Sequence, residues 1–453
     1  MIPSTIIPFL STRFNHQATQ FRAVSIDTRT LKAGDLYIPL VANRNGHLFI
    51  DKAIENGAQA ALWNKNEPLP SSLPPGFQLY MVEDTLKALQ KMAENYRAMV
   101  NPIVIAITGS NGKTTTKDLV EAVLSLEAVT YKTQGNFNNH IGLPLTILAM
   151  PLDCQYLILE MGMSGFGEIE LLSTIAKPNQ AIVTNIGESH MEQLGSREGI
   201  AKAKMEIISG LVLDGHVYMD ADEALLKPYW NEQSKLIGFD SKLATAIKDL
   251  KMTEDGYTFT FEGHNYFLPI LGKHNVKNAA YAIALASELG FDSEQIQSGL
   301  ASVQITGMRL EKTRGPFGEL VINDAYNASP TSVKAAIETI KEMPSFEKKI
   351  LVIGDLYELG KDEETLHRQL ASSITHPITA IVWVGELMKW MYDEWQKSYY
   401  DENIQAFYFQ KKEEAAHTIY SLTDESSVVL FKASRGMKLE ELISAYQQEG
   451  KEG

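Results

Sequence analysis

In the last third of the chain, short apolar runs alternate most regularly with segments whose apolar residues recur at helical spacing. Short runs rich in Val, Ile and Leu predict strands at residues 320–323, 350–353, 378–384 and 428–431. Apolar residues at helical spacing predict helices at residues 332–342, 363–373, 411–421 and 438–447. This alternation favours a doubly wound, Rossmann-like sheet. The segment has no G-x-G-x-x-G motif, so a dinucleotide cofactor is not indicated.

The middle of the chain shows the same alternation. Apolar runs predict strands at residues 103–108, 156–160, 181–186 and 217–219. A helix is predicted at residues 272–289, entered from the sequence Gly-Lys-His-Asn. These elements indicate a mostly parallel sheet, whose ligands would bind at the carboxyl ends of the strands.

The beginning of the chain has weaker signals. Strands are predicted at residues 23–26 and 36–41, and helices at 49–56 and 84–98. Two polar clusters follow the strands, Asp27-Thr28-Arg29 and Asn43-Arg44-Asn45-Gly46-His47, and either turn formation or ligand binding explains them. Asn101-Pro102 marks a boundary. We expect an α/β protein of three domains: a small N-terminal α/β domain at 1–99, a central α/β domain at 100–310 and a C-terminal Rossmann-like domain at 311–453.

Composition narrows the class of protein. The 453 residues include 41 basic and 56 acidic side chains, giving a net charge of −15, which argues against a surface for DNA or RNA. The single cysteine, Cys154, excludes an internal disulfide and is expected to be a buried structural thiol. The N-terminal segment lacks a basic region and contains Pro3 and Pro8, so it does not resemble a signal peptide. We expect a monomeric cytoplasmic protein with no membrane insertion.

A glycine-rich loop follows the predicted strand at residues 103–108. The amides of residues 109–113, here called the phosphate loop, would surround one point at a helix N-terminus, which favours a phosphate group. Lys113 adds a positive charge, and the Thr114 hydroxyl can reach Mg²⁺. Only two residues separate the glycines, so this is a shortened Walker loop; the alternative is a Gly/Asn turn capped by threonines. The nucleotide-binding candidates here are Thr108, Gly109, Ser110, Asn111, Gly112, Lys113, Thr114 and Thr115.

Further candidates lie at the ends of the next strands. Glu160 ends a strand of the same predicted sheet and is placed to bind the same metal ion, although it could be a solvated strand-end acid. His190 follows the next strand and is a candidate for the same edge. Lys202 and Lys204 lie on a predicted helix but on different faces, and the alternative is a solvated basic face, which composition does not exclude. Arg309 lies near the junction of the second and third domains, where a cation could reach a transferring phosphoryl group.

Nine motifs in the same order resemble those of a known family. They are T-G-S-N-G-K-T-T-T-K-D, L-E-M-G-M, N-I-G-E-S-H, A-K-A-K-M-E-I, G-K-H-N-V-K-N-A-A, G-M-R-L-E, N-D-A-Y-N-A-S-P, V-I-G-D-L-Y-E-L-G and K-A-S-R-G-M-K-L-E. Over essentially its full length the chain resembles the Mur ligases of peptidoglycan synthesis. The motifs D-T-R, N-G-H, E-L-G and S-R-G-M-K-L-E resemble those of the member that acts on D-alanyl-D-alanine.

The resemblance implies an ATP-dependent ligase that joins D-Ala-D-Ala to UDP-MurNAc-tripeptide through an acyl phosphate. Lys113 would hold the β- and γ-phosphates, and Arg309 would contact the γ-phosphate. Mg²⁺ would be bound by Thr114, Glu160 and His190, and also by Lys204 if this lysine is a carbamate. Ser329 and Ala433 depart from the residues that are common in the family, Asn and Gly, without removing a charge or a metal ligand.

The resemblance also implies contacts with the nucleotide and the substrates. Asn278, Asp324, Tyr326 and Asn327 would contact adenine and ribose. The UDP-sugar would be bound by Asp27, Thr28, Arg29, Asn43, Arg44 and His47. The muramyl peptide would contact Thr133, Asn136, Asn138 and Asn139, and Ser434 and Arg435 would complete the substrate site.

Two other functions remain as alternatives. A folylpolyglutamate synthase shares the phosphate loop and the acyl-phosphate chemistry, but about 100 residues precede the loop here, whereas folate ligases begin nearly at it. A nucleotide-dependent switch would bind or hydrolyse ATP without either ligase substrate.

Overall fold

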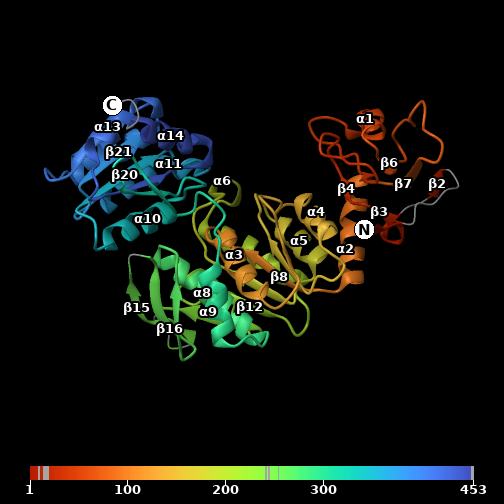
Figure 1. Ribbon diagram of the computed structural model, residues 1–453, viewed down its shortest axis with the longest axis horizontal. Helices are drawn as coiled ribbons and strands as arrows, with labels where there is room; N and C mark the ends of the chain where they lie inside the picture. The colour runs from red at the N-terminus through yellow and green to blue at the C-terminus, as the bar shows by residue number, and fades with distance from the viewer. Residues whose placement is uncertain (9–10, 14–19, 240–241, 243–244, 254, 450–453) are drawn as a thin grey trace.

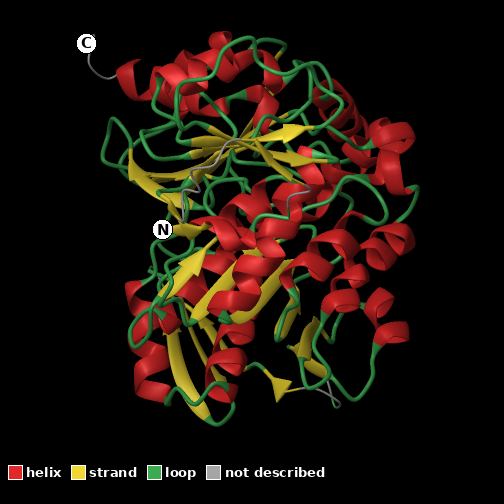
Figure 2. Cartoon of the chain, turned by 90° about the vertical axis from the view of Figure 1, so that its right-hand side faces the viewer, coloured by secondary structure: helices red, strands yellow, loops and turns green. Residues whose placement is uncertain are grey.

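The computed structural model describes residues 1–8, 11–13, 20–239, 242, 245–253 and 255–449. The chain forms three α/β bodies in sequence order (Figure 1). The central body lies between the N-terminal body, drawn in red and orange, and the C-terminal body, drawn in blue. Figure 2 shows helices flanking the strands of the sheets. The expected α/β architecture is therefore confirmed.

The central domain is built on a parallel sheet of seven strands in the order β14-β13-β12-β11-β8-β10-β9. Its strands are β8 (Ile103–Thr108), β9 (Thr130–Lys132), β10 (Tyr156–Glu160), β11 (Gln180–Val183), β12 (His216–Asp220), β13 (Ser234–Gly238) and β14 (Thr245–Ala246). Its helices are α3 (Lys113–Leu124), α4 (Gly142–Ala149), α5 (Glu168–Ala176), α6 (Met191–Leu194), α7 (Arg197–Met205), α8 (Lys273–Glu288) and α9 (Ser293–Ser302). Strand β8 pairs with β10 on one side and β11 on the other, so the phosphate loop lies between the ends of these two strands.

Both faces of the central sheet are covered. Val104 and Ala106 of β8 belong to the core shared with α4 and α5, whereas Ile105 and Ile107 face the core that contains α3 and α8. Complete burial on both faces explains why β8 is an unbroken apolar run rather than an alternating one. Each fully buried aliphatic side chain contributes about 1.5–3 kcal/mol.

The N-terminal domain has a five-stranded sheet in the order β2-β7-β6-β5-β4. Its elements are β1 (Ile2–Pro3), β2 (Ser11–Arg13), β3 (Gln20–Phe21), β4 (Val24–Ser25), β5 (Leu36–Tyr37), α1 (Ile50–Glu55), β6 (Ala60–Asn64), β7 (Gln78–Val82) and α2 (Thr85–Val100). The Asp84 side chain caps α2, which ends at the left-handed Asn101. Helix α2 packs on α4, and Tyr96 donates to the Met150 carbonyl at 3.0 Å, so the N-terminal and central cores are continuous.

The C-terminal sheet has six strands in the order β18-β19-β23-β20-β21-β22. Its strands are β18 (Glu311–Arg314), β19 (Leu320–Asn323), β20 (Lys348–Gly354), β21 (Ala380–Val384), β22 (Gln405–Phe409) and β23 (Ser427–Lys432). Its helices are α10 (Pro330–Glu342), α11 (Glu363–Leu370), α12 (Met388–Ser398), α13 (Ala416–Leu422) and α14 (Leu439–Glu449). Only β18 is antiparallel, and separate cores cover the two faces of the sheet, as the Rossmann-like prediction required.

Several predicted elements were wrong in extent or were missed. The strand expected at 36–41 ends at Tyr37, the one expected at 181–186 ends at Val183, and the helix expected from 411 begins only at Ala416. Strands β6, β7 and β22 and helix α12 were not predicted. An antiparallel sheet of β15 (Lys248–Met252), β16 (Tyr257–Phe261) and β17 (His264–Leu268) was also missed. Short apolar runs are ambiguous without their tertiary partners.

The burial of Cys154 and the length of the helices bear on two further predictions. Cys154 is buried, and burial raises the pKa of its thiol to about 11, as expected for a structural residue. No helix in the described ranges is both long and apolar enough to cross a bilayer.

Candidate active site

The phosphate loop connects β8 to α3, and its two glycines are required by close contacts. A Cβ at Gly109, where φ is +149°, would collide with the Thr184 hydroxyl. At Gly112, where φ is +81°, it would lie 2.8 Å from Asn278 Oδ1. The loop is further held by the side chain of Asn185, which accepts the Asn111 N–H at 2.9 Å. Because glycine has no Cβ, the backbone of the phosphate loop lies closer to Thr184 and Asn278 than a residue with a side chain would allow.

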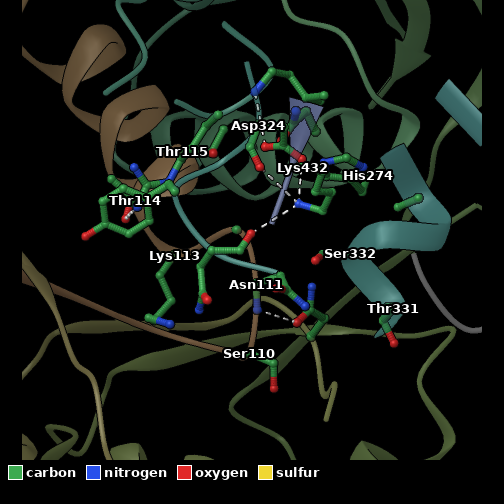
Figure 3. A pocket seen from close by; sticks show the side chains of 18 of the residues that line it. Ser110, Asn111, Lys113, Thr114, Thr115, His274, Asp324, Thr331, Ser332 and Lys432 are labelled. Carbon is green, nitrogen blue, oxygen red and sulfur yellow. Dashed lines mark hydrogen bonds and ion pairs between the residues drawn. The ribbon is translucent and has the colours of Figure 1, made fainter. Parts of the chain in front are cut away.

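A cavity of about 290 Å³ lies between the central and C-terminal domains (Figure 3). The central domain lines it with Ser110, Asn111, Gly112, Lys113, Thr114, Thr115, Asn138, Glu160, Asn185, His274 and Asn275, and the segment between the two domains lines it with Arg309 and Leu310. The C-terminal domain adds Asp324, Tyr326, Asn327, Thr331, Ser332, Ala335 and Lys432. The structure thus brings the phosphate loop, Glu160, Arg309 and three of the four predicted adenine and ribose contacts into one cavity.

Glu160 is the buried acid of this cavity. Its Oε2 accepts the Thr114 hydroxyl at 2.8 Å, and its Oε1 accepts the Asn138 amide at 2.9 Å. Lys117 Nζ lies 3.9 Å from the same Oε2 and donates to the Thr133 carbonyl at 3.0 Å. A carboxylate and a hydroxyl oxygen in contact form the kind of hard-oxygen donor set that Mg²⁺ prefers when phosphates supply the remaining ligands.

Arg309 lies on the segment between the central and C-terminal domains, and its side chain extends to Thr114 beside the phosphate loop. One guanidinium nitrogen donates to the Thr114 hydroxyl at 3.1 Å, and the guanidinium lies 3.7 Å from the centre of the Tyr326 ring. Within the described part of the chain, the buried Nη1 atom of Arg309 has no hydrogen-bond partner. Because a buried donor without a partner is unfavourable, this nitrogen is suited to an anionic ligand such as a phosphate.

The C-terminal wall of the cavity is held by an ion pair between the buried Lys432 and the half-buried Asp324. Lys432 Nζ lies 2.6 Å from Asp324 Oδ2 and also donates to the Asn327 carbonyl at 3.2 Å. The other oxygen of Asp324 accepts the Leu310 N–H at 3.2 Å. These bonds fix the C-terminal wall of the cavity relative to the segment that bears Arg309.

Three basic groups near the phosphate loop have lowered pKa values. Burial lowers the pKa of Lys113, whose ammonium donates to the Gly109 carbonyl at 2.9 Å. Burial and the nearby Lys113 charge lower the pKa of Lys204 well below its usual range, whereas Lys202 is exposed, as their spacing predicted. Burial, Lys204 and Lys113 lower the pKa of His190 to about 4, although Glu358 lies 3.5 Å from its Nδ1. Desolvation of the His190 ring outweighs the attraction of the exposed Glu358 carboxylate.

The polar clusters of the N-terminal domain are held mainly by their own contacts. Asp27 accepts the Arg29 backbone N–H at 2.9 Å and pairs with its exposed guanidinium at 2.6 Å. The buried ring of His47 contacts Asn45 Oδ1 through Nδ1 at 2.8 Å and accepts the Asn64 N–H through Nε2 at 3.3 Å. Both ring nitrogens of His47 are therefore already bonded, whereas Arg44 is exposed on the same loop.

The other predicted contact residues differ in burial and in whether they line the cavity. Thr133 is buried and accepts the Glu160 N–H at 3.0 Å, Asn139 Oδ1 accepts the Gly142 N–H at 2.8 Å where α4 begins, and Asn136 is exposed. Asn278 packs against Gly112 and does not line the cavity. Ser434 is buried and accepts the Tyr357 N–H at 2.9 Å, whereas the exposed Arg435 pairs with Glu440 at 2.7 Å.

Several residues in the cavity or next to it were not predicted from the sequence. Lys117 lies four residues after Lys113, so helical spacing could have placed it on the same face. Asn185, His274 and Lys432 were inside recognised motifs but were not singled out. Contacts across the domains gave no sequence signal: Ser329 lies 3.3 Å from Asn111, and Thr331 donates to Glu188 at 2.7 Å.

Comparisons with known proteins show which family the chain resembles. A family model described as the Mur ligase middle domain matches residues 107–286, and one described as the Mur ligase, glutamate ligase domain matches residues 308–435. The chain is 44% identical to UDP-N-acetylmuramoyl-tripeptide--D-alanyl-D-alanine ligase of Bacillus subtilis, covering 94% of this chain and 93% of that protein.

Solved structures give the same result. A crystal structure of MurF from Acinetobacter baumannii matches with a TM-score of 0.84 at 29% identity, covering 94% of this chain and 93% of that one. MurF ligase from Thermotoga maritima in complex with ADP matches with a TM-score of 0.84 at 26% identity, covering 95% and 98%.

Proposed function

Because the chain belongs to the Mur ligase family, we propose that it is an ATP-dependent ligase that joins D-alanyl-D-alanine to UDP-N-acetylmuramoyl-tripeptide. The product would be the UDP-linked pentapeptide used in peptidoglycan synthesis. The observation that best supports this is the cavity in which the phosphate loop, the Glu160–Thr114 pair and the unpartnered Arg309 Nη1 converge. The relative from T. maritima was solved in complex with ADP, which supports nucleotide binding by this chain.

The reaction requires two transfers. A terminal carboxylate oxygen of the tripeptide attacks the γ-phosphorus of ATP, the bond to the bridging oxygen of ADP breaks, and an acyl phosphate forms. The dipeptide amine then attacks the acyl carbon, loses a proton and displaces inorganic phosphate. Lys113, the loop amides and Arg309 stabilise the negative charge on the phosphoryl group that is transferred. The −15 net charge makes these local cations necessary for binding anionic substrates.

Mg²⁺ fits the donor set of the cavity. Thr114 and Glu160 would hold the ion together with phosphate oxygens, and its charge would lower repulsion between the carboxylate and ATP. His190, which is neutral at pH 7 because its pKa is lowered, is available as a nitrogen ligand.

Lys204 is a candidate for carbamylation, which would complete the metal-binding set. Its lowered pKa favours the neutral amine, whose lone pair can attack CO₂ and lose a proton to give an anionic carbamate. NMR of protein incubated with ¹³C-bicarbonate and substrates tests this step. A carbamate signal that is absent from the Lys204→Ala variant supports it, and its absence from both proteins excludes it.

We propose the outer substrate sites that the family resemblance implies. Arg29 and Arg44 of the N-terminal domain would bind the UDP group, with Asp27, Thr28, Asn43 and His47 shaping the loops. The muramyl peptide would pass Asn136, Asn138 and Asn139, and the dipeptide would be bound near Ser434 and Arg435. We also propose that the protein is a monomer in the cytoplasm.

The domain organisation separates this proposal from the alternatives. Folate ligases lack a domain before the phosphate loop, whereas the described residues before the loop here include a separate five-stranded sheet. A nucleotide switch would release phosphate without substrates. Coupled phosphate release from ATP should therefore require both UDP-MurNAc-tripeptide and D-Ala-D-Ala. ¹⁸O placed in the tripeptide carboxylate should appear in the released phosphate, and its retention in the peptide would contradict the acyl-phosphate step.

A further inference from the structure

The segment that joins α9 to β18, residues 303–310, is bound to helix α3 at two points. At the first point, Asp118 Oδ2 accepts both the backbone N–H and the hydroxyl of Thr306, at 2.9 and 2.8 Å. Three residues later, Arg309 donates to the Thr114 hydroxyl at 3.1 Å. Because Thr114 and Asp118 are four residues apart, they lie on the same face of α3, one turn from each other. The segment therefore runs along α3 toward the phosphate loop.

The carboxylate of Asp118 is well suited to act as a fixed anchor. Its side chain is 0% exposed, and its other oxygen accepts Lys132 Nζ at 2.9 Å. Lys132 also pairs with Glu121 at 3.1 Å, so the carboxylate is held from the helix and from strand β9. Hydrogen bonds to a buried carboxylate are stronger than those between neutral groups. Thr306 is thus tied to the rigid core of the central domain.

From Met308 onward the segment is bonded to the C-terminal domain. The Met308 carbonyl accepts the Tyr326 N–H at 3.2 Å, and the Leu310 N–H donates to Asp324 at 3.2 Å. Met308 and Leu310 have positive φ angles of 61° and 49°, which are unusual for side chains of this size and persist only where surrounding contacts hold them. Only Gly307 separates the two attached parts, and a Cβ there would meet nothing closer than 3.4 Å.

We propose that Asp118 and Thr306 form the pivot of the C-terminal domain and act as positioning residues for Arg309. With Thr306 fixed on α3, rotation of the C-terminal domain about Gly307 moves the guanidinium of Arg309 to the phosphate loop along a single path. If the bond between Asp118 and Thr306 is weakened, the segment can lift from α3, and Arg309 loses its alignment with the γ-phosphate. This inference rests on the ligase function proposed above.

Thr306 offers a matched pair of variants. Thr306→Val removes the hydroxyl with little change in shape, Thr306→Ser keeps it, and the exposed position makes both compatible with folding. We expect Thr306→Val to lower kcat about tenfold, as for loss of a hydrogen bond to a charged group, and to leave the KM for UDP-MurNAc-tripeptide unchanged. Thr306→Ser should stay within twofold of the wild type.

A double variant shows whether Thr306 acts through Arg309. If it does, adding Thr306→Val to Arg309→Ala should cause no further loss of kcat, because the group to be positioned is already absent. A merely structural role would give the same loss in both backgrounds. Wild-type kcat in Thr306→Val, or an additive loss in the double variant, would overturn the proposal.

Small-angle scattering provides a readout that does not depend on ligation. A non-hydrolysable ATP analogue should compact the wild type and Thr306→Ser, and should compact Thr306→Val to a smaller extent. If the wild type released no phosphate with both substrates, the proposed function would fail. Equal compaction of all three proteins would instead reject the pivot, so the two failures are distinguishable.

Discussion

The nucleotide cavity and the polar clusters of the N-terminal domain differ in how their side chains are partnered. In the cavity, side chains from two domains converge, yet the buried Nη1 of Arg309 has no partner within the described residues. In the N-terminal domain, Arg29 pairs with the nearby Asp27, and both nitrogens of His47 are bonded. The cavity therefore keeps a donor that can bind an anion, whereas Asp27, Arg29 and His47 of the N-terminal domain are bonded to neighbouring groups of the same domain.

This difference indicates different functions for polar residues in the two regions. Buried cations in the cavity can stabilise charge strongly, because water does not screen them. Exposed cations such as Arg44 contribute less, since solvent competes for them. Substitutions in the cavity should therefore change kcat, and those in the N-terminal clusters should change substrate affinity or stability.

The largest effect is expected at Lys113. Lys113→Ala should lower kcat about 1000-fold, because it removes a half-buried charge that would stabilise the transferring phosphoryl group. Phosphate release with saturating substrates measures the loss, and circular dichroism checks the fold. The exposed Lys202→Ala is the matched control. Near-normal turnover of Lys113→Ala would remove the cavity lysine from the mechanism.

Arg309 should show the next largest effect. Arg309→Ala should lower kcat about 100-fold through loss of phosphate contact, and Arg309→Lys should restore only part of it, because lysine lacks the planar fork that stacks on Tyr326. Steady-state kinetics with varied ATP measures both variants. Full rescue by lysine would mean that charge alone is sufficient at this position.

Arg44 tests the opposite side of the comparison. Arg44→Ala should raise the KM for UDP-MurNAc-tripeptide roughly tenfold, as for loss of one charge-assisted hydrogen bond at an exposed site, with kcat nearly unchanged. Lys52→Ala, which removes another exposed cation from the same domain, should leave this KM unaltered. A fall in kcat without a change in KM would contradict the assignment of this loop to substrate binding.

The smallest effect concerns pH and His190. Its pKa is lowered to about 4 in the folded protein from a usual value of 6.5, so the unfolded chain binds more protons between these values. Stability should therefore fall as the pH decreases from 6.5 toward 4. His190→Gln should remove about 1 kcal/mol of this loss at pH 5, after allowing for partial exposure of the ring.

Urea unfolding at pH 7.5 and pH 5 measures the His190 effect. The exposed His140→Gln is the control and should retain the pH dependence of the wild type. A His190→Gln protein that loses as much stability as the wild type between the two pH values would show that the histidine is not held neutral in the folded state.

Local sequence patterns were sufficient for the parts of the site that lie on one element or at one strand end. The apolar run at residues 103–108, the glycine spacing and the following helix predicted the phosphate loop, and Glu160 followed from its place at a strand end. The role of His47 could not be predicted in the same way. Its burial against Trp63, 4.7 Å between ring centres, depends on strand β6, which the sequence pattern did not reveal.

The sequence by itself determined the three α/β units, the phosphate loop and the family, because these depend on short spacings and on the order of motifs. Tertiary structure alone decided that Arg309 meets Thr114, 195 positions away, and that Thr306 is held by Asp118, 188 positions away. The physical reason is that side-chain periodicity sets which face of an element is buried, but the packing of one domain on another sets which distant groups come within hydrogen-bond distance.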